Sequence, residues 1–327
     1  MEETIEQNQF QEELNDLRNH VLKVKNEVHK VIVGQDKMID LFLAALFTKG
    51  HVLLEGVPGI AKTLTAKLLA KTISVDFSRI QFTPDLMPSD VIGTSVFNMK
   101  NSEFVFNQGP VFSNVVLIDE INRSPAKTQA SLFEVMEERQ VTVDGQTYLM
   151  EFPFMVVATQ NPIEQEGTYK LPEAQLDRFL FRVKLEYPSL DDEKIILKRF
   201  KEDFSLDQNQ KIAKVLNKTN LKKCQEIIEK IHIKDELLDY IAALVHNTRN
   251  NGDLFLGASP RASLAIMKSA KAIAAMKGRE FVIPDDIQFV AYPVLNHRIM
   301  LTAEREMEGF EVEDIIKGII QNIEVPR

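Results

Sequence analysis

The chain has 327 residues, of which 44% are hydrophobic and 27% charged, a composition typical of a globular protein of about two domains rather than a disordered one. The net charge of −9 argues against a surface that binds nucleic acid all over, although a local basic patch would not show in the total. The acidic first residues do not form a secretory signal, the longest apolar run (41–47) is too short to span a membrane, and the single cysteine, Cys224, permits no disulfide within the chain. We therefore expect a cytoplasmic protein in which Cys224 has a structural role.

The first 50 residues predict two helices. Between residues 14 and 31, apolar side chains recur every three or four positions, as on one face of an amphipathic helix. A second such pattern, at 38–46, ends at Gly50. We treat residues 1–30 as an N-terminal helical segment.

From residue 51 onwards, short apolar runs alternate with helical patterns. Strands are predicted at 51–55, 80–82, 115–119, 154–159 and 179–185, and helices at 62–72 and 126–139. This alternation indicates a parallel sheet that is covered by helices on both faces. Two segments interrupt it and predict β-hairpins, at 94–106 and at 141–150, the second around the strong turn signal Asp144-Gly145.

After Pro188 the strand patterns vanish. Helices are predicted at 191–203, 222–230, 235–249, 261–277 and 311–321. We therefore expect an α/β domain at 31–187 and a helical domain at 188–327.

A glycine-containing loop joins the first predicted strand to the helix at 62–72, which is the context of a phosphate-binding loop. With the first helical turn it reads Gly56, Val57, Pro58, Gly59, Ile60, Ala61, Lys62, Thr63 and Leu64. Glycines let backbone N–H groups face a phosphate, and the helix start adds the positive end of its dipole. Lys62 would reach the outer phosphates and the Thr63 hydroxyl would bind Mg²⁺. The usual pattern has glycine in place of Ala61, so a plain strand–turn–helix corner is the alternative.

Acidic and amide side chains follow two of the predicted strands. Asp119 and Glu120 end the apolar strand at 115–119, where buried carboxylates need a partner such as Mg²⁺. Asp119 would hold the metal, and Glu120 would orient or deprotonate the attacking water. Asn161, just past the strand at 154–159, could position the same water. The alternatives are a solvated strand end and an ordinary turn asparagine.

Two arginines complete the set. Arg178 lies at the edge of the last predicted strand and Arg261 at the start of the helix at 261–277. Either one alone could be a surface arginine that pairs with a nearby carboxylate.

The order Lys62, Asp119-Glu120, Asn161, Arg178 and Arg261 resembles that of the AAA+ ATPases, in which such residues are the Walker A lysine, the Walker B acids, sensor 1, the arginine finger and sensor 2. The stretches GVPGIAKT (56–63), FTPDLMPSDVIGT (82–94), ATQNPIEQEGTYKLPEAQLDRF (158–179) and GASPRA (257–262), together with 109–145, look like the MoxR family. The resemblance covers roughly residues 20–325. Ala61 is usual in that family.

The resemblance implies an αβα sandwich with a five-stranded parallel core sheet, a smaller all-helical lid, a helix-2 insert (94–106) and a pre-sensor-1 hairpin (141–150). Subunits would form hexameric rings in which Arg178 reaches the neighbour's site, and Arg261 would report the state of ATP or ADP to the lid. Ile32, Val33 and Gly34 would flank the adenine, unless they are simply core residues. Relatives are proposed chaperones that remodel or mature client proteins or load their cofactors, often with a separate von Willebrand factor A domain protein.

Two other functions stay open: a nucleic-acid-dependent AAA+ motor, and a scaffold that switches shape on binding nucleotide without significant turnover. The acidic balance and the lack of a recognisable DNA-binding module count against the first. The intact Glu120, Asn161 and Arg178 count against the second. Arg123 could face a neighbouring subunit or pair with an acidic side chain. The six histidines show no metal-ligand spacing and are expected to be structural or surface groups.

Overall fold

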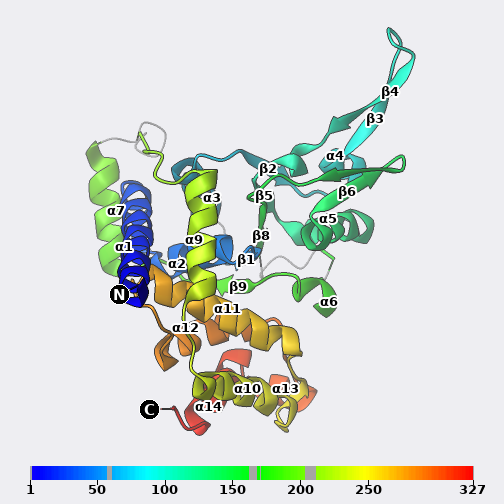
Figure 1. Ribbon diagram of the computed structural model, residues 1–327. Coiled ribbons are helices and arrows are strands. Elements are labelled where there is room, and N and C mark those ends of the chain that lie inside the picture. Colours follow the sequence, from blue (N-terminus) through cyan, green and yellow to red (C-terminus); the bar gives the residue numbers. More distant parts are fainter. Residues whose placement is uncertain (1, 57–60, 162–167, 170, 203–210, 327) are drawn as a thin grey trace.

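A five-stranded parallel sheet forms the centre of the computed structural model, which describes residues 2–56, 61–161, 168–169, 171–202 and 211–326. The strand order is β2-β5-β8-β1-β9 (Figure 1). The bounds are β1 Val52–Glu55, β2 Phe77–Gln81, β5 Val115–Asp119, β8 Met155–Gln160 and β9 Phe181–Lys184. The five predicted strands and the parallel sheet are confirmed.

Apolar cores lie on both faces of this sheet. In β5, Val115 and Leu117 belong to one buried cluster while Val116 and Ile118 belong to the other, because successive side chains of a strand point to opposite faces. Helices α1 (Glu2–His29), α2 (Asp36–Phe47) and α3 (Lys62–Ile73) contribute to the first cluster, and α4 (Pro88–Ile92) and α5 (Ala126–Glu138) to the second. The uninterrupted apolar sequence of β5 thus reflects burial on both sides.

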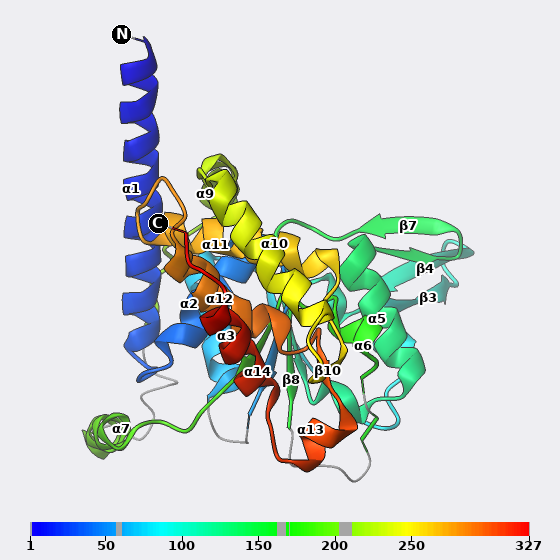
Figure 2. The ribbon, with the colours of Figure 1, turned by 90° about the horizontal axis from the view of Figure 1, so that it is seen from below.

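Helix α1 joins the sheet to the C-terminal half of the chain. Its buried side chains recur at helical spacing and face α3, α9 and α11: Leu14, Leu17, Val21, Val24 and Val28. Its first turns project past the body of the molecule (Figure 2). Among the described residues, no helix is both long and apolar enough to cross a membrane.

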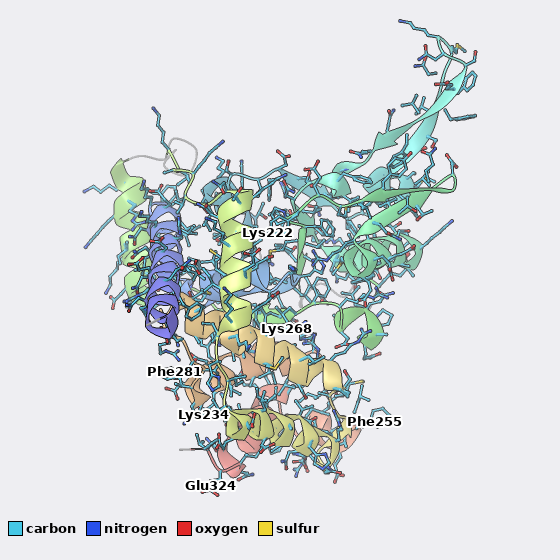
Figure 3. The ribbon with its side chains drawn as sticks, viewed as in Figure 1. Lys222, Lys234, Phe255, Lys268, Phe281 and Glu324 are labelled. Atoms are coloured by element: carbon cyan, nitrogen blue, oxygen red, sulfur yellow. The ribbon has the colours of Figure 1, made fainter. Side chains whose placement is uncertain are left out.

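Among its described residues, the C-terminal half consists of helices and loops apart from one short antiparallel strand pair, β10 (Leu254–Leu256) with β11 (Met300–Leu301). Its described helices are α7 Leu190–Glu202, α9 Lys218–Lys230, α10 Asp235–Arg249, α11 Pro260–Met276, α12 Pro284–Leu295, α13 Ala303–Met307 and α14 Val312–Asn322. The strand pair, α12 and α13 were not predicted. Helix α12 contains Pro293, a residue that ordinarily interrupts a helix. Phe255 of β10 is exposed on the surface of this part (Figure 3).

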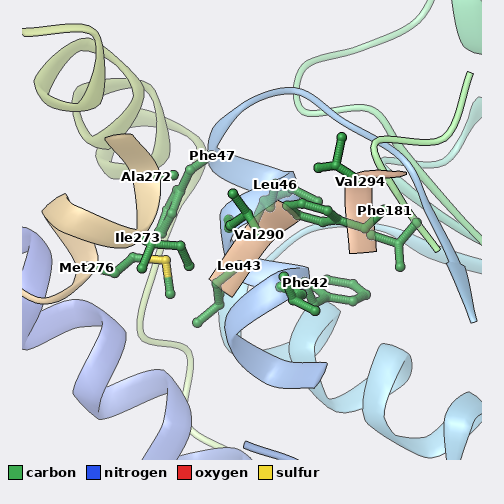
Figure 4. Close-up of a cluster of buried hydrophobic side chains, with 14 of the residues drawn as sticks. Phe42, Leu43, Leu46, Phe47, Phe181, Ala272, Ile273, Met276, Val290 and Val294 are labelled. Atoms are coloured by element: carbon green, nitrogen blue, oxygen red, sulfur yellow. The ribbon is translucent and has the colours of Figure 1, made fainter. Parts of the chain in front are cut away.

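Helix α2 lies between the sheet and these C-terminal helices. Phe42 and Phe47 share one apolar cluster with Phe181 of β9, Ile273 of α11 and Val290 of α12 (Figure 4). The C-terminal helices therefore dock on the sheet through a continuous hydrophobic core, which is the dominant stabilising term in such packing.

The two predicted hairpins are present and are tied to each other. They pair β3 (Gly93–Asn98) with β4 (Glu103–Gln108), and β6 (Gln140–Val143) with β7 (Gln146–Leu149). The Ser95 hydroxyl donates to Asp144 Oδ2 over 2.5 Å, and the rings of Phe106 and Tyr148 lie 4.5 Å apart. The longer hairpin projects away from the body (Figure 1). At its base a Cβ on Gly93 (φ +104°) would lie 2.2 Å from the Asn107 carbonyl oxygen, so only glycine fits there.

A buried histidine links the sheet to α5. His51 Nδ1 accepts from the Val156 N–H of β8 over 2.9 Å, so Nε2 carries the proton and donates to the Met136 carbonyl over 3.1 Å. Burial, together with the nearby charge of Arg139, lowers the pKa of His51 to about 3. The ring therefore stays neutral in the folded protein.

This arrangement predicts a pH-dependent stability. Above pH 6.5 the contribution of His51 is complete; as the pH falls from 6.5 towards 3, only the unfolded chain takes up the proton, so the free energy of unfolding decreases. The loss is about 1.4 kcal/mol per pH unit. Urea unfolding at several pH values should show a shallower dependence for His51→Gln than for the unchanged protein. Equal slopes would contradict the assignment.

Candidate functional site

The carboxyl ends of β1, β5 and β8 meet at one edge of the sheet, because the strands are parallel. Gly56 follows β1, Asp119 ends β5 and Asn161 follows β8. Asn161 is 7% exposed. We call this edge, where three of the predicted site residues meet, the carboxyl edge.

A hydroxyl and a carboxylate converge at the carboxyl edge. Thr63, in the first turn of α3, donates from Oγ1 to Asp119 Oδ1 over 3.4 Å, and the Thr159 hydroxyl donates to the same oxygen over 3.2 Å. Asp119 is 6% exposed. Such hard oxygen donors suit Mg²⁺, so the residues present fit the metal implied by the sequence. Lys62 Nζ donates to the Gly56 carbonyl over 2.7 Å, at the mouth of the same loop.

The loop itself is only partly described. Val57, Pro58, Gly59 and Ile60 lie outside the described residues. Ala61 has φ +54°, the left-handed conformation for which glycine is the usual residue. The alanine methyl costs on the order of 1 kcal/mol there, a small penalty for the departure from the common pattern. Leu64, in the first turn of α3, packs partly buried against the core.

Glu120 stands at a sharp turn immediately after β5. Its φ is +56°, and its N–H donates to Thr159 Oγ1 over 3.0 Å. Its Oε2 accepts from Gln81 Nε2 over 2.7 Å and lies 3.4 Å from Arg123 Nε. Arg123 therefore lies beside an acidic side chain of its own chain, one of the two arrangements considered for it.

Two polar residues of β2 were not predicted to belong here. Arg79 Nε lies 2.5 Å from Asp119 Oδ2, and Gln81 holds Glu120. They flank the buried Ile80 on the sheet's outermost strand, which pairs with β5. The signal available in the sequence was their alternation with Ile80, since residues two apart in a strand share a face.

Arg178 and Arg261 lie at the opposite edge. Arg178 precedes β9, and the neighbouring Leu180 N–H donates to the carbonyl of His51, which precedes β1. Arg178 Nη1 donates to the Phe133 carbonyl over 2.7 Å and lies 3.5 Å from Glu137 Oε2 near the end of α5. We call this edge, where β1 and β9 begin, the amino edge.

Glu137 brings the two arginines together. Its Oε1 lies 3.7 Å from Arg261 Nη2, and Arg261 Nη1 lies 3.7 Å from Asp177 Oδ2. Four residues of β1 separate the two edges, about 13 Å at 3.3 Å per residue. The course of α11 therefore takes its first turn, with Arg261, to the amino edge and away from Lys62 and Thr63.

Residues 32–34, which we expect to flank the adenine, lie partly in the hydrophobic core. Ile32 is 4% exposed and belongs to the main hydrophobic cluster, which is the alternative considered for it. Val33 and Gly34 are half-buried. Gly34 has φ +67°, and an added Cβ would lie 3.1 Å from Asp192 Oδ2, so the start of α7 closes over this turn.

Comparisons with known proteins agree with this geometry. The family described as "ATPase family associated with various cellular activities (AAA)" matches residues 51–181, and the "AAA lid domain" matches residues 246–319. The uncharacterized protein YeaC of Bacillus subtilis is 46% identical over 97% of each chain. Chaperone MoxR1 of Mycobacterium tuberculosis is 44% identical over 92% of this chain and 81% of its own.

A solved structure is similar over the whole length. The crystal structure of a Cytophaga hutchinsonii protein, 43% identical, superposes with a TM-score of 0.90 and covers 99% of this chain and 100% of its own. Motif order, sheet topology, helical lid and relatives all agree. The chain therefore belongs to the MoxR family of AAA+ ATPases.

Proposed function

We propose that the protein hydrolyses ATP in an oligomeric ring whose active sites are each completed by two subunits. One observation carries this proposal. The groups suited to bind and attack a triphosphate lie at the carboxyl edge, whereas Arg178 and Arg261 lie at the amino edge. A second copy, placed with its amino edge against the carboxyl edge of the first, would unite them.

The carboxyl edge would bind the nucleotide. The backbone of the loop at 56–64 and Lys62 would hold the phosphates, as in other phosphate-binding loops. Thr63 and Asp119 would hold Mg²⁺, which when bound neutralises charge on the β- and γ-phosphates. Arg79 would give up its bond to Asp119, because that carboxylate cannot serve both partners fully.

Glu120 is the best-placed general base. Its carboxylate is about one-third exposed and stands at the turn after β5, and the buried Asn161 follows the neighbouring strand β8. It would take the proton of the attacking water while the Asn161 amide orients that water. In the structure the Glu120 carboxylate accepts from Gln81 and lies beside Arg123. One of these two contacts would have to break before the carboxylate could bind the attacking water.

The arginine pair would stabilise negative charge that develops on the neighbour's phosphates. The side chains of Arg178 and Arg261 are 31% and 64% exposed, so both can reach a partner. In related nucleotide hydrolases such an arginine is worth roughly 10³–10⁵ in rate. We infer a hexameric ring from the family resemblance.

A chaperone role is supported by the relative named Chaperone MoxR1. The projecting hairpin exposes Phe97, Met99 and Phe104, which suit contact with an apolar stretch of a client polypeptide. A separate von Willebrand factor A domain protein is the partner that the family resemblance implies.

Two substitutions separate binding from hydrolysis. Lys62→Ala should abolish ATP binding, because the phosphates lose their main cation, whereas Glu120→Gln should bind ATP and lose at least about 10²-fold in turnover. Equilibrium binding of ATP and steady-state phosphate release measure both. Normal turnover of Glu120→Gln would remove it from the mechanism.

The split site predicts that activity depends on assembly. Turnover per subunit should rise with protein concentration and then saturate, with sedimentation following the oligomer in parallel. Turnover that is independent of concentration, in a protein shown to dissociate, would contradict the shared site. Stimulation by single-stranded DNA would favour a nucleic-acid motor, and binding without turnover in the assembled ring would favour a scaffold.

Mixing two inactive variants tests which subunit supplies the arginine. Arg178→Ala should bind ATP and fail to hydrolyse it, and adding Lys62→Ala subunits should restore turnover, because each Lys62→Ala subunit offers intact arginines to its neighbour. No recovery, in rings shown to be mixed, would place Arg178 within one subunit's site.

A further inference from the structure

Three consecutive polar residues are buried in the turn after α12. Asn296, His297 and Arg298 are 4%, 5% and 9% exposed. Buried polar and charged side chains are costly unless hydrogen bonds satisfy them. The bonds they make reach mostly out of the lid, to the segment that carries Arg178. We call residues 296–298 the lid turn.

Arg298 makes most of these bonds. Its Nε donates to Asp177 Oδ1 over 2.6 Å, and its Nη2 donates to the carbonyls of Asp177 (3.1 Å) and Phe179 (2.7 Å). Its Nη1 donates to the carbonyls of Leu180 (3.2 Å) and Val294 (2.5 Å). An arginine has five N–H donors in a planar fork, so these five contacts match its full capacity.

The other two residues of the lid turn reinforce the attachment. His297 Nε2 donates to the Phe179 carbonyl over 3.0 Å, and its Nδ1 lies 3.1 Å from Asn296 Oδ1. Burial holds the pKa of His297 well below its usual value, so the ring is neutral. Asn296 Nδ2 donates to the Arg182 carbonyl of β9 over 2.9 Å.

The segment that receives these bonds has no regular secondary structure of its own. Residues 177–180 form the turn that connects α6 (Glu173–Leu176) to β9. Their N–H groups donate to carbonyls of α6 and of His51, whereas the carbonyls of Asp177, Phe179 and Leu180 accept from Arg298. Arg178 lies in this turn. Three of the carbonyls that Arg298 engages belong to this segment.

The same contact reaches Arg261. The Asp177 carboxylate bridges Arg298 through Oδ1 and Arg261 through Oδ2, and Glu137 in turn bridges Arg261 and Arg178. The side chain of Arg298 is 5% exposed, whereas those of Arg261 and Arg178 are 64% and 31% exposed. A buried arginine thus anchors two that face outwards.

We propose that Arg298 is a positioning residue for the two interface arginines: by fixing residues 177–180 to the lid, it sets the direction in which Arg178 and Arg261 reach the neighbouring subunit's phosphates. This inference rests on the shared site proposed above. It assigns the lid turn to the active site of the neighbouring subunit and not to the site at the chain's own phosphate loop.

The substitution that tests this is Arg298→Lys. Lysine keeps the charge beside Asp177 but cannot donate to the several carbonyls in the geometry of the guanidinium fork. We expect ATP affinity within about twofold of the unchanged protein and kcat reduced about 10²-fold, the cost of misplacing a catalytic group by about 1 Å. Lys62→Ala subunits should restore turnover, as for Arg178→Ala.

Arg279→Lys is the matched control. Arg279 also pairs with a buried lid carboxylate, Asp286, through Nη1 (2.7 Å) and Nη2 (2.6 Å), but contacts neither interface arginine. This variant should retain kcat, whatever it does to thermal stability. If Arg298→Lys does not fold, Asp177→Asn takes its place, since it removes the charge that bridges Arg298 and Arg261 while keeping the side chain's shape. The same rescue is expected.

The outcomes separate the inference from the function on which it rests. Unchanged kcat in Arg298→Lys overturns the positioning role. A loss of kcat that Lys62→Ala does not rescue, while Arg178→Ala is rescued, places the defect in the chain's own phosphate site and overturns it too, with the shared site intact. If Arg178→Ala is not rescued either, in rings shown to be mixed, the shared site itself fails and the inference falls with it.

Discussion

The common direction of the five strands is the constraint on which the rest of the structure depends. In a parallel sheet, every residue that follows a strand lies at one edge and every residue that precedes a strand lies at the other. Asp119 ends a strand and Glu120 and Asn161 follow strands, whereas Asp177 and Arg178 precede one. Strand direction alone therefore divides the proposed catalytic groups, and for this reason the proposed function requires a neighbouring copy.

The packing of the lid fixes where its residues lie relative to the two edges of the sheet. One apolar cluster runs from the sheet through α2 to α11 and α12 (Figure 4), so a shift of the lid relative to the sheet would have to repack this core. The first turn of α11 is thereby held at the amino edge, where Arg261 meets Glu137. In the proposed ring, the lid would contribute this charged group to the subunit interface.

Local patterns made much of this predictable. The five strands, the two hairpins and the context of Lys62 and Thr63 depend on periodicity and on neighbours in the sequence, and the structure has each of them where the pattern indicated. Helix α12 was missed because Pro293 interrupts its pattern. The lid turn could not be found in this way, since the contact between Arg298 and Asp177 joins residues 121 positions apart. The same limit applied to Arg261. Its residue type and its place in the motif order could be read from the sequence, but tertiary packing decides at which edge of the sheet it lies.

The charges at the amino edge account for the burial of Arg298 and the exposure of Arg178 and Arg261. Three arginines share two carboxylates, Asp177 and Glu137, so the cluster keeps one net positive charge for an incoming anion. If all three were exposed, ordering their long side chains on contact would cost on the order of 2 kcal/mol each. Arg298 has lost that freedom already through its five bonds, and its burial lowers its pKa without neutralising it because Asp177 opposes the shift. The buried, already ordered part of the cluster is therefore separated from the exposed part that, in the proposed ring, would meet the phosphates of another subunit.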